Sequence, residues 1–164
     1  RRASHMEKIA ISCILEVYPN VDALSTWQQQ LFQAATKALD SAYAPYSQFR
    51  VGAALLMDDD SIVTGSNQEN AAYPSGLCAE RVAFFTAGSQ FPGKIIKAVA
   101  ITTSYPLEQP IAPCGACRQV MAEYELKQQT PIQLILSSGE GNIYTMANCR
   151  DMLPLYFSGE WLKK

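Results

Sequence analysis

Three cysteines and one glutamate have the residue types and the spacing of a metal centre that could do chemistry. Cys78 and Glu80 form a C-x-E motif, and Cys114 and Cys117 follow in a P-C-x-x-C motif. Zn²⁺ prefers sulfur and nitrogen ligands, and a catalytic zinc keeps three protein ligands and one open position for water. Three thiolates with an unligated carboxylate beside the first of them therefore predict one catalytic Zn²⁺ per chain.

Glu80 is the residue that we expect to move protons in this centre. Bound zinc lowers the pKa of its water toward ~7, so hydroxide becomes available at neutral pH. Glu80 would take that proton and return it to the substrate and to the leaving group. Two alternatives stay open: buried free thiols, or a zinc that only stabilises the fold, although a structural site normally has four protein ligands.

The elements around these motifs alternate between strand and helix. Apolar residues at helical spacing predict helices, and β-prone runs bounded by turn residues predict strands. The expected helices cover residues 22–43, 77–88 and 115–127, and the expected strands cover 50–57, 61–69, 94–103, 131–137 and 143–147, with a further N-terminal strand over 8–17. The acidic triplet 58–60 fits a solvated turn better than a metal site, 139–142 fits a second turn, and 148–164 fits short helix and coil. This alternation indicates α/β layering with helices on both faces of one sheet.

Helix entries are the positions at which the motifs can converge. Cys114 and Cys117 are three residues apart and fit one helical turn, whereas Cys78 and Glu80 fit only where the chain enters a helix. Backbone N–H groups and the positive dipole end at two helix N-termini would offset thiolate charge and lower the thiol pKa. Arg81 lies three residues after Cys78, and we expect it to reach the sulfur cluster and compensate its charge.

The composition limits the remaining possibilities. Residues 1–5 look like a tag or linker remnant ahead of Met6, and His5 within it is the only histidine. A Ser-His-Asp triad, a Cys-His pair or a histidine metal site is therefore excluded elsewhere. Without Arg1 and Arg2, 11 basic residues stand against 15 acidic ones. This balance, with no Lys/Arg run, argues against a nucleic-acid partner and favours a small-molecule substrate.

The length of 164 residues predicts one domain over residues 6–164, with 6–21 as an N-terminal extension. No signal peptide and no apolar run long enough to cross a membrane is visible, so we expect a cytoplasmic protein without a membrane partner. Without a secretion signal, five cysteines favour metal binding over a disulfide framework. Cys13 and Cys149 lie outside any motif and are expected to behave as small apolar residues.

Further motifs run through residues 30–157 in a specific order. They are Ala44-Pro45-Tyr46-Ser47-Gln48-Phe49, Val51-Gly52-Ala53-Ala54, Asn67-Gln68-Glu69-Asn70-Ala71, Tyr73-Pro74, Cys78-Ala79-Glu80-Arg81 and Pro113-Cys114-Gly115-Ala116-Cys117-Arg118-Gln119. This set resembles the cytidine deaminases of the small homotetrameric type with three cysteine zinc ligands. The resemblance implies a three-layer α/β/α fold with one mixed central sheet. It also implies hydrolysis of cytidine and deoxycytidine to the uridines with release of ammonia, for pyrimidine salvage, in which zinc hydroxide attacks C4 and Glu80 shuttles protons.

The same resemblance implies the residues that bind the substrate. Asn67 and Glu69 match residues that bind the ribose 3′-hydroxyl, Phe49 matches an aromatic that packs on the pyrimidine ring, and the backbone N–H of Ala79 would meet the pyrimidine O2. Residues i and i+2 share one side of a strand, and an amide with a carboxylate suits a sugar hydroxyl. The alternatives are a polar pair on an edge strand for Asn67 and Glu69, and a plain core position for Phe49.

Three more positions would complete the pocket of a neighbouring subunit. Ala71, Tyr73 and Phe157 fall where family members contribute across subunits of the homotetramer. The residues that depart from the commonest family pattern are Arg50, Gln68, Leu155 and Tyr156. Gln68 is expected to point away from the ribose.

Other substrates and one other class of protein remain alternatives. The same chemistry would suit a blasticidin-type antibiotic or another amino-pyrimidine, but Asn67 and Glu69 favour a nucleoside with a free sugar hydroxyl. A carboxylate at the sugar would repel a phosphate, and the acidic composition and the cysteine at the first ligand position disfavour a polynucleotide. A non-catalytic zinc-binding protein on this fold is the last alternative, and the intact Glu80 argues against it.

Overall fold

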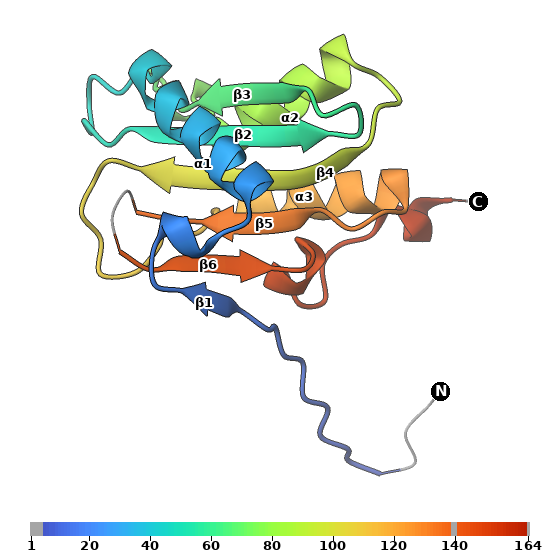
Figure 1. Cartoon of the computed structure of the whole chain (residues 1–164). Coiled ribbons are helices and arrows are strands. Elements are labelled where there is room, and N and C mark those ends of the chain that lie inside the picture. Colours follow the sequence, from blue (N-terminus) through green and yellow to red (C-terminus); the bar gives the residue numbers. More distant parts are fainter. Residues whose placement is uncertain (1–4, 139–140, 164) are drawn as a thin grey trace.

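A mixed six-stranded sheet forms the centre of the protein in the computed structural model, which describes residues 5–138 and 141–163 (Figure 1). The strands are β1 (Glu16–Tyr18), β2 (Val51–Met57), β3 (Ile62–Ser66), β4 (Ile96–Thr103), β5 (Gln133–Leu136) and β6 (Ile143–Met146). They lie in the order β1-β6-β5-β4-β2-β3. β4 and β5 run parallel, and the other neighbouring pairs run antiparallel. The expected mixed sheet is therefore confirmed.

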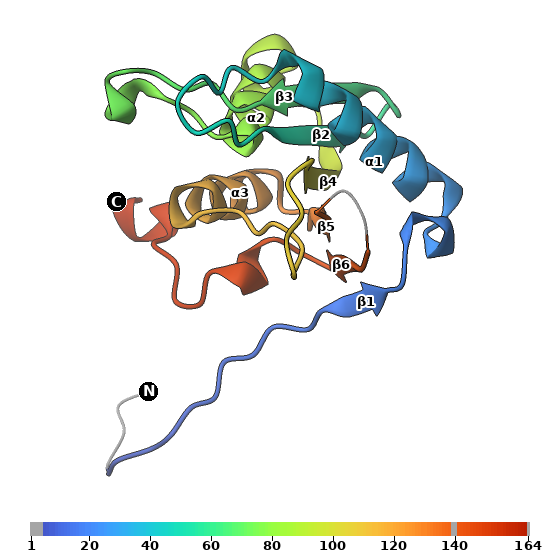
Figure 2. The ribbon, with the colours of Figure 1, turned by 90° about the vertical axis from the view of Figure 1, so that its left-hand side faces the viewer.

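Helices cover both faces of this sheet, as the alternation of elements predicts. The α-helices are α1 (Thr26–Ala38), α2 (Ala79–Gln90) and α3 (Gly115–Gln128). Figure 2 shows α1 on one side of the sheet and α2 and α3 on the other. The buried apolar residues form two clusters, one between the sheet and α2 and α3, the other under α1. Strands β2 and β4 contribute to both clusters because alternate side chains point to opposite faces, which explains their continuous apolar runs.

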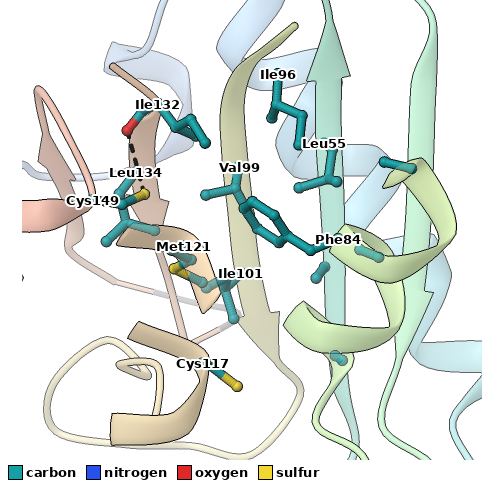
Figure 3. Packing of buried hydrophobic residues seen from close by; sticks show 14 of the residues in the cluster. Leu55, Phe84, Ile96, Val99, Ile101, Cys117, Met121, Ile132, Leu134 and Cys149 are labelled. Atoms are coloured by element: carbon teal, nitrogen blue, oxygen red, sulfur yellow. Dashed lines mark hydrogen bonds between the residues drawn. The ribbon is translucent and has the colours of Figure 1, made fainter. Parts of the chain in front are cut away.

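The larger cluster extends to the sulfur-rich end of the molecule. Phe84 of α2 and Met121 of α3 pack toward β4, and Cys117 lies at one end of the group (Figure 3). Cys149 is also buried there, and its thiol donates to the carbonyl of Ile132 at 3.3 Å. The expectation of a small apolar residue is thus confirmed for Cys149, whereas Cys13 is exposed.

The start of α2 approaches the sheet so closely that a side chain on β3 would not fit. A Cβ atom placed on Gly65 would lie 2.5 Å from both the carbonyl oxygen of Ala79 and the backbone nitrogen of Ala83. These contacts are with helix backbone and not with a flexible side chain, so the helix would have to move. Gly65 therefore fixes the depth at which the first turn of α2 lies, and that turn carries Glu80.

Several boundaries differ from the predicted ones for local reasons. α1 begins at Thr26 and not at residue 22, because Ser25 and Gln28 form a capping box that starts the helix there. The N-terminal strand covers three residues instead of 8–17. Glu16 pairs with Thr145, next to the end of β6, so earlier residues have no strand beside them in the described chain.

Short 3-10 helices complete the described chain. They cover Val21–Ala23, Leu39–Ser41, Tyr73–Ser75, Arg150–Met152 and Gly159–Leu162, so the expectation of short helix and coil after residue 148 is confirmed for the described part. Residues 1–4 of the expected tag and residues 139–140 of the expected turn lie outside the described residues. Among the described helices, none has the length and apolar character needed to cross a membrane.

Candidate active site and metal centre

The three motif cysteines meet at the start of two helices. Cys78 is the N-cap residue of α2, Cys114 is the N-cap residue of α3, and Cys117 lies in the first turn of α3. The sulfur atoms of Cys78 and Cys114 are 3.8 Å apart, and those of Cys114 and Cys117 are 3.5 Å apart. All three lie within 4.8 Å of one another. The predicted convergence of the motifs at two helix entries is confirmed.

This sulfur triangle fits a zinc ion with an open position. Thiolates are soft ligands suited to Zn²⁺, and the three sulfur atoms are near enough to share one ion. Within the described part of the chain, no histidine, acidic residue or further cysteine joins this group as a fourth ligand. A structural zinc site normally has four protein ligands, so three ligands favour a catalytic centre.

Arg81 provides positive charge beside the sulfur atoms, as its spacing from Cys78 predicts. Its Nη2 atom lies 3.8 Å from Cys78 Sγ. Its Nε atom is buried and has no hydrogen-bond partner within residues 5–138 and 141–163. A partly buried guanidinium next to thiols is favourable when those thiols carry negative charge, which is their state as metal ligands.

The surroundings shift the pKa values of Cys78 and Cys117 in opposite directions. A hydrogen bond with Cys117, together with the Arg81 guanidinium and Cys114, lowers the pKa of Cys78 to about 5 against the opposing effect of burial. The same hydrogen bond with Cys78, together with burial, raises the pKa of Cys117. Cys78 is thus the thiol that loses its proton more easily. Cys117 holds its proton more tightly and must release it to become a metal ligand.

Glu80 is a carboxyl group whose pKa is matched to proton transfer at neutral pH. It lies in the first turn of α2 and is only 5% exposed. Burial is the main cause that raises its pKa to about 7, and the negative charge of Cys78 adds to this shift. A group with such a pKa can both accept and donate a proton near pH 7.

An open hollow of about 460 Å³ adjoins the metal centre, a size within the range of small-molecule sites. Five of the predicted site residues line it, namely Asn67, Glu69, Tyr73, Cys78 and Arg81. Gln68 lines it too, although its side chain amide donates to the carbonyl of Ser41 and the hydroxyl of Ser66. The hollow therefore brings the predicted sugar-binding residues and the first metal ligand to one surface.

Asn67 does not lie on β3, because that strand ends at Ser66. Its side chain instead braces the segment before β2: Oδ1 accepts from the backbone N–H of Val51 at 2.9 Å, and Nδ2 donates to the carbonyl of Phe49 at 2.8 Å. The predicted strand over 61–69 therefore extends three residues too far, although Asn67 and Glu69 still line the same hollow. Asn67 positions the segment that carries Phe49.

Glu69 makes a similar contact with the preceding loop. Its carboxylate accepts from the backbone N–H groups of Tyr46 at 2.9 Å and Ser47 at 3.2 Å, and from the hydroxyl of Ser47. The hydroxyl bond is the main cause that lowers the pKa of Glu69. Sequence reasoning missed Ser47 in this role, although the residue stands within one of the quoted motifs.

The remaining predicted substrate residues, Phe49 and Ala79, belong to the packed interior. Phe49 is half-buried against the larger core cluster, with its ring centroid 5.3 Å from that of Tyr105. Ala79 is fully buried at the first position of α2, where a helix leaves backbone N–H groups without an intrahelical partner. Neither residue lines the hollow of the single chain.

The three predicted cross-subunit residues are exposed. Ala71 is exposed, Tyr73 is 79% exposed, and Phe157 is 56% exposed with its ring edge-to-face on Trp161. Phe157 lies on the segment that follows the Arg150–Met152 turn, and Gln119 donates to its carbonyl at 2.8 Å. All three side chains are thus open to contact from outside the chain.

A three-layer α/β/α fold that holds three thiols at two helix N-termini, with a buried carboxyl beside them, defines a zinc-dependent deaminase. Residues 25–130 match the family described as the cytidine and deoxycytidylate deaminase zinc-binding region. The cytidine deaminase of Halalkalibacterium halodurans is 50% identical over 133 residues, which is 81% of this chain and 96% of that protein. The chain belongs to the cytidine deaminase family.

Further relatives agree with this assignment. The cytidine deaminase of Sporosarcina psychrophila is 43% identical over 132 residues, 80% of this chain and 92% of that protein. The crystal structure of cytidine deaminase from Burkholderia pseudomallei superposes with a TM-score of 0.70 at 41% identity, covering 78% of this chain and 97% of that chain. The predicted family, the α/β fold, the hydrolytic deaminase class and the zinc cofactor are confirmed.

Proposed function

We propose that the chain hydrolyses cytidine and deoxycytidine to uridine and deoxyuridine with release of ammonia, as a cytoplasmic enzyme of pyrimidine salvage. The observation that carries this proposal is the buried Glu80, with a pKa of about 7, beside three thiols that lie within 4.8 Å of one another. The open hollow next to this centre has room for a nucleoside. The 50% identity to the Halalkalibacterium halodurans cytidine deaminase supports the choice of base.

Glu80 carries the proton transfers of the proposed reaction. Zinc held by Cys78, Cys114 and Cys117 would supply Lewis acidity, which would make a water molecule nucleophilic at neutral pH. The carboxylate of Glu80 accepts the proton of that water and donates it to N3 of the cytosine ring, so that C4 can be attacked. Glu80 then transfers a proton from the added hydroxyl to the exocyclic amine, which leaves as ammonia.

The residues around Glu80 make these transfers possible. Burial keeps the carboxyl close to the midpoint of its titration at neutral pH, so both directions of transfer are accessible. Arg81 offsets the negative charge of three thiolates and keeps the centre electrophilic. The backbone N–H of Ala79 at the start of α2 would donate to the pyrimidine O2, and Phe49 would pack on the ring.

The hollow favours a nucleoside over a nucleotide. Glu69 lines it with a carboxylate whose lowered pKa keeps it negative at neutral pH. This charge would attract a sugar hydroxyl and repel a phosphate at the same place. Asn67 lines the hollow as well, and its bonds to the 49–51 backbone hold the neighbouring segment in position while it contacts the ribose.

We further propose that residues 6–164 form one domain, with 6–21 as an extension, and that four copies assemble. Ala71, Tyr73 and Phe157 would reach the pockets of neighbouring copies. The exposure of Tyr73 and Phe157 supports this role, because large aromatic side chains that a single chain leaves open to water gain most from contact with another subunit.

Ultraviolet absorbance of cytidine mixed with the zinc-loaded protein tests the proposed function, with 5′-CMP in parallel. We expect loss of the cytidine signal alone. Glu80→Gln should retain zinc and lose turnover, whereas the exposed Glu123→Gln on α3 serves as the matched control and should keep both. Turnover of CMP instead of cytidine would refute the role of Glu69. If the zinc-loaded protein turns over neither compound, two alternatives remain: the substrate is a modified amino-pyrimidine, or the protein binds zinc without catalysing a reaction.

A further inference from the structure

The N-terminal arm, residues 6–15, leaves an unusual number of large apolar side chains in water. Figures 1 and 2 both show this segment extending away from the sheet as a continuation of β1. Its exposed apolar residues are Met6, Ile9, Ile11, Ile14 and Leu15, with exposed fractions between 40% and 84%. A soluble chain seldom exposes such a stretch unless it forms part of an interface.

The arm has the sequence pattern of a β-strand with one apolar face. Its odd-numbered residues, continued into β1, are Ile9, Ile11, Cys13, Leu15 and Val17, whereas its even-numbered residues are Lys8, Ala10, Ser12, Ile14 and Glu16. In a strand these two sets point to opposite sides. The arm therefore has the pattern of a strand, yet among the described residues strand pairing stops at Glu16, opposite Thr145 near the end of β6.

We propose that the arms of two copies of this chain pair as antiparallel strands around a two-fold axis at Ser12. In this register Lys8 lies opposite Glu16 of the second copy, and the two-fold axis makes the same pair twice. Ile9 lies opposite Leu15 and Ile11 opposite Cys13, so apolar residues meet on the odd-numbered face. The arm is thus complementary to itself in both charge and hydrophobicity.

Neighbouring registers lose this complementarity. Moving the axis by one residue to Cys13 places Lys8 opposite Tyr18, and moving it to Ile11 places Lys8 opposite Ile14. Both shifts keep the apolar face intact, because they preserve the odd and even sets, but both leave the charge of Lys8 without its opposite. Pairing of charges across the strands therefore selects the register at Ser12.

The apolar face of the paired arms has a surface to cover on the body of the protein. Val17 is paired with Tyr144, which packs against the cluster under α2 and α3, so the odd-numbered side chains face that side of the sheet. Ile11 and its neighbour Ser12 line a hollow of about 220 Å³ together with residues 150–151 and 153–156. Leu155 in this segment is 88% exposed. A second arm beside the first would shield these residues from water.

Disulfide trapping tests the register directly. Ser12→Cys is placed in a Cys13→Ser background in zinc-loaded protein, so that the metal ligands are protected during mild oxidation. Residues opposite each other on antiparallel strands have Cα atoms about 4.5–5.5 Å apart, which is within the range of a disulfide. We expect a covalent pair of twice the chain mass on a non-reducing gel, lost on reduction.

Ala10→Cys in the same background is the matched control. It lies on the same face of the same arm, but its counterpart in the second copy is four residues along the strand, about 13 Å away. We expect no covalent pair from this variant. Adding Lys8→Glu to the Ser12→Cys protein should slow cross-linking, and adding Glu16→Lys as well should restore the rate, since the opposite charges are then exchanged.

Three outcomes would overturn the proposal: equal cross-linking of the Ser12→Cys and Ala10→Cys variants, cross-linking through Cys13 in the otherwise unchanged protein, and no cross-linking at all. Absence of cross-linking would also be the result if each arm paired with some other strand of a neighbouring chain and not with the second arm. The result does not depend on the proposed deaminase activity, because the arm lies outside the candidate active site. Cytidine turnover by each variant serves only to show that the protein is folded.

Discussion

Replacement of Glu125 by glutamine should destabilise the protein more than any ordinary surface change, because this carboxylate joins three parts of the chain. Glu125 lies on α3 and its side chain is only 1% exposed. Its oxygen atoms accept from the backbone N–H groups of Ile132 at 2.8 Å, Cys149 at 2.6 Å and Arg150 at 3.2 Å. Arg150 Nε also pairs with it at 3.1 Å.

The size of the effect follows from the contacts that glutamine cannot make. The amide keeps the shape of the side chain, but its NH₂ group would face backbone N–H groups, and the charge that pairs with Arg150 is lost. Leaving a buried backbone N–H without an acceptor costs about 1–3 kcal/mol, and the lost ion pair adds less, because the Arg150 side chain is itself 47% exposed. Against a total stability of about 5–15 kcal/mol for a domain, this corresponds to a fall in Tm of about 5 °C.

The same contacts lead to the metal centre. Glu125 holds the backbone at the start of the Arg150–Met152 turn. Arg118 Nη1 donates to the carbonyl of Met152 at 2.9 Å, and its Nε donates to the carbonyl of Pro113 at 2.8 Å. Pro113 immediately precedes a predicted zinc ligand. A loosened turn should therefore also release zinc to a chelator faster.

Thermal unfolding followed by far-ultraviolet circular dichroism measures the first effect, and zinc transfer to a chromogenic chelator measures the second. Glu123→Gln is the control, since Glu123 lies on the same helix but is exposed and should change stability by only about 0.5 kcal/mol. If Glu125→Gln unfolds at the same temperature as Glu123→Gln, the carboxylate does not hold these segments together and the reasoning fails.

Three further substitutions probe the site. Gly65→Ala should cost about 1–3 kcal/mol and lower kcat, because its Cβ would meet the backbone of Ala79; an unchanged melting curve would contradict this close approach. Arg81→Ala should speed zinc loss in a chelator assay, with Arg81→Lys intermediate; full retention of zinc and of turnover would remove its charge-compensating role. Asn67→Ala leaves two backbone groups of the 49–51 segment unpaired and should cost about 1–3 kcal/mol and raise KM; denaturant unfolding and steady-state kinetics with cytidine would detect both changes.

The fold was predictable wherever a local pattern decides the structure. The helix over 115–127 and the strands over 94–103 and 131–137 follow from hydrophobic periodicity alone, and α3, β4 and β5 lie at these places. The start of α1 could also have been predicted from the sequence, because Ser25 and Gln28 have the spacing of a capping box. The length of β1 was not, because it depends on where β6 ends, more than a hundred residues further along the chain.

The candidate site also contains some features that the sequence predicts and others that depend on contacts between distant segments. The positions of Cys78, Cys114 and Cys117 follow from ligand chemistry and helix geometry, both of which act over a few residues. The side-chain bonds of Asn67 to the 49–51 segment join residues 16–18 apart, and those of Glu125 join residues up to 25 apart. No local pattern marks such pairs, since their partners are backbone groups that only the folded chain brings together.

The geometry of the metal centre is a consequence of how α2 and α3 are fixed to each other and to the sheet. Between the middle of α2 and the last turns of α3, the Tyr124 hydroxyl donates to the Phe84 carbonyl at 2.9 Å, and the two rings meet edge-to-face at 5.1 Å. At their near ends, Gly65 lets α2 lie against the sheet, while Arg118 anchors the entry to α3. Both helices are therefore positioned by contacts that need no metal. These contacts help to hold the three thiols together, so less binding energy is needed to order them as ligands.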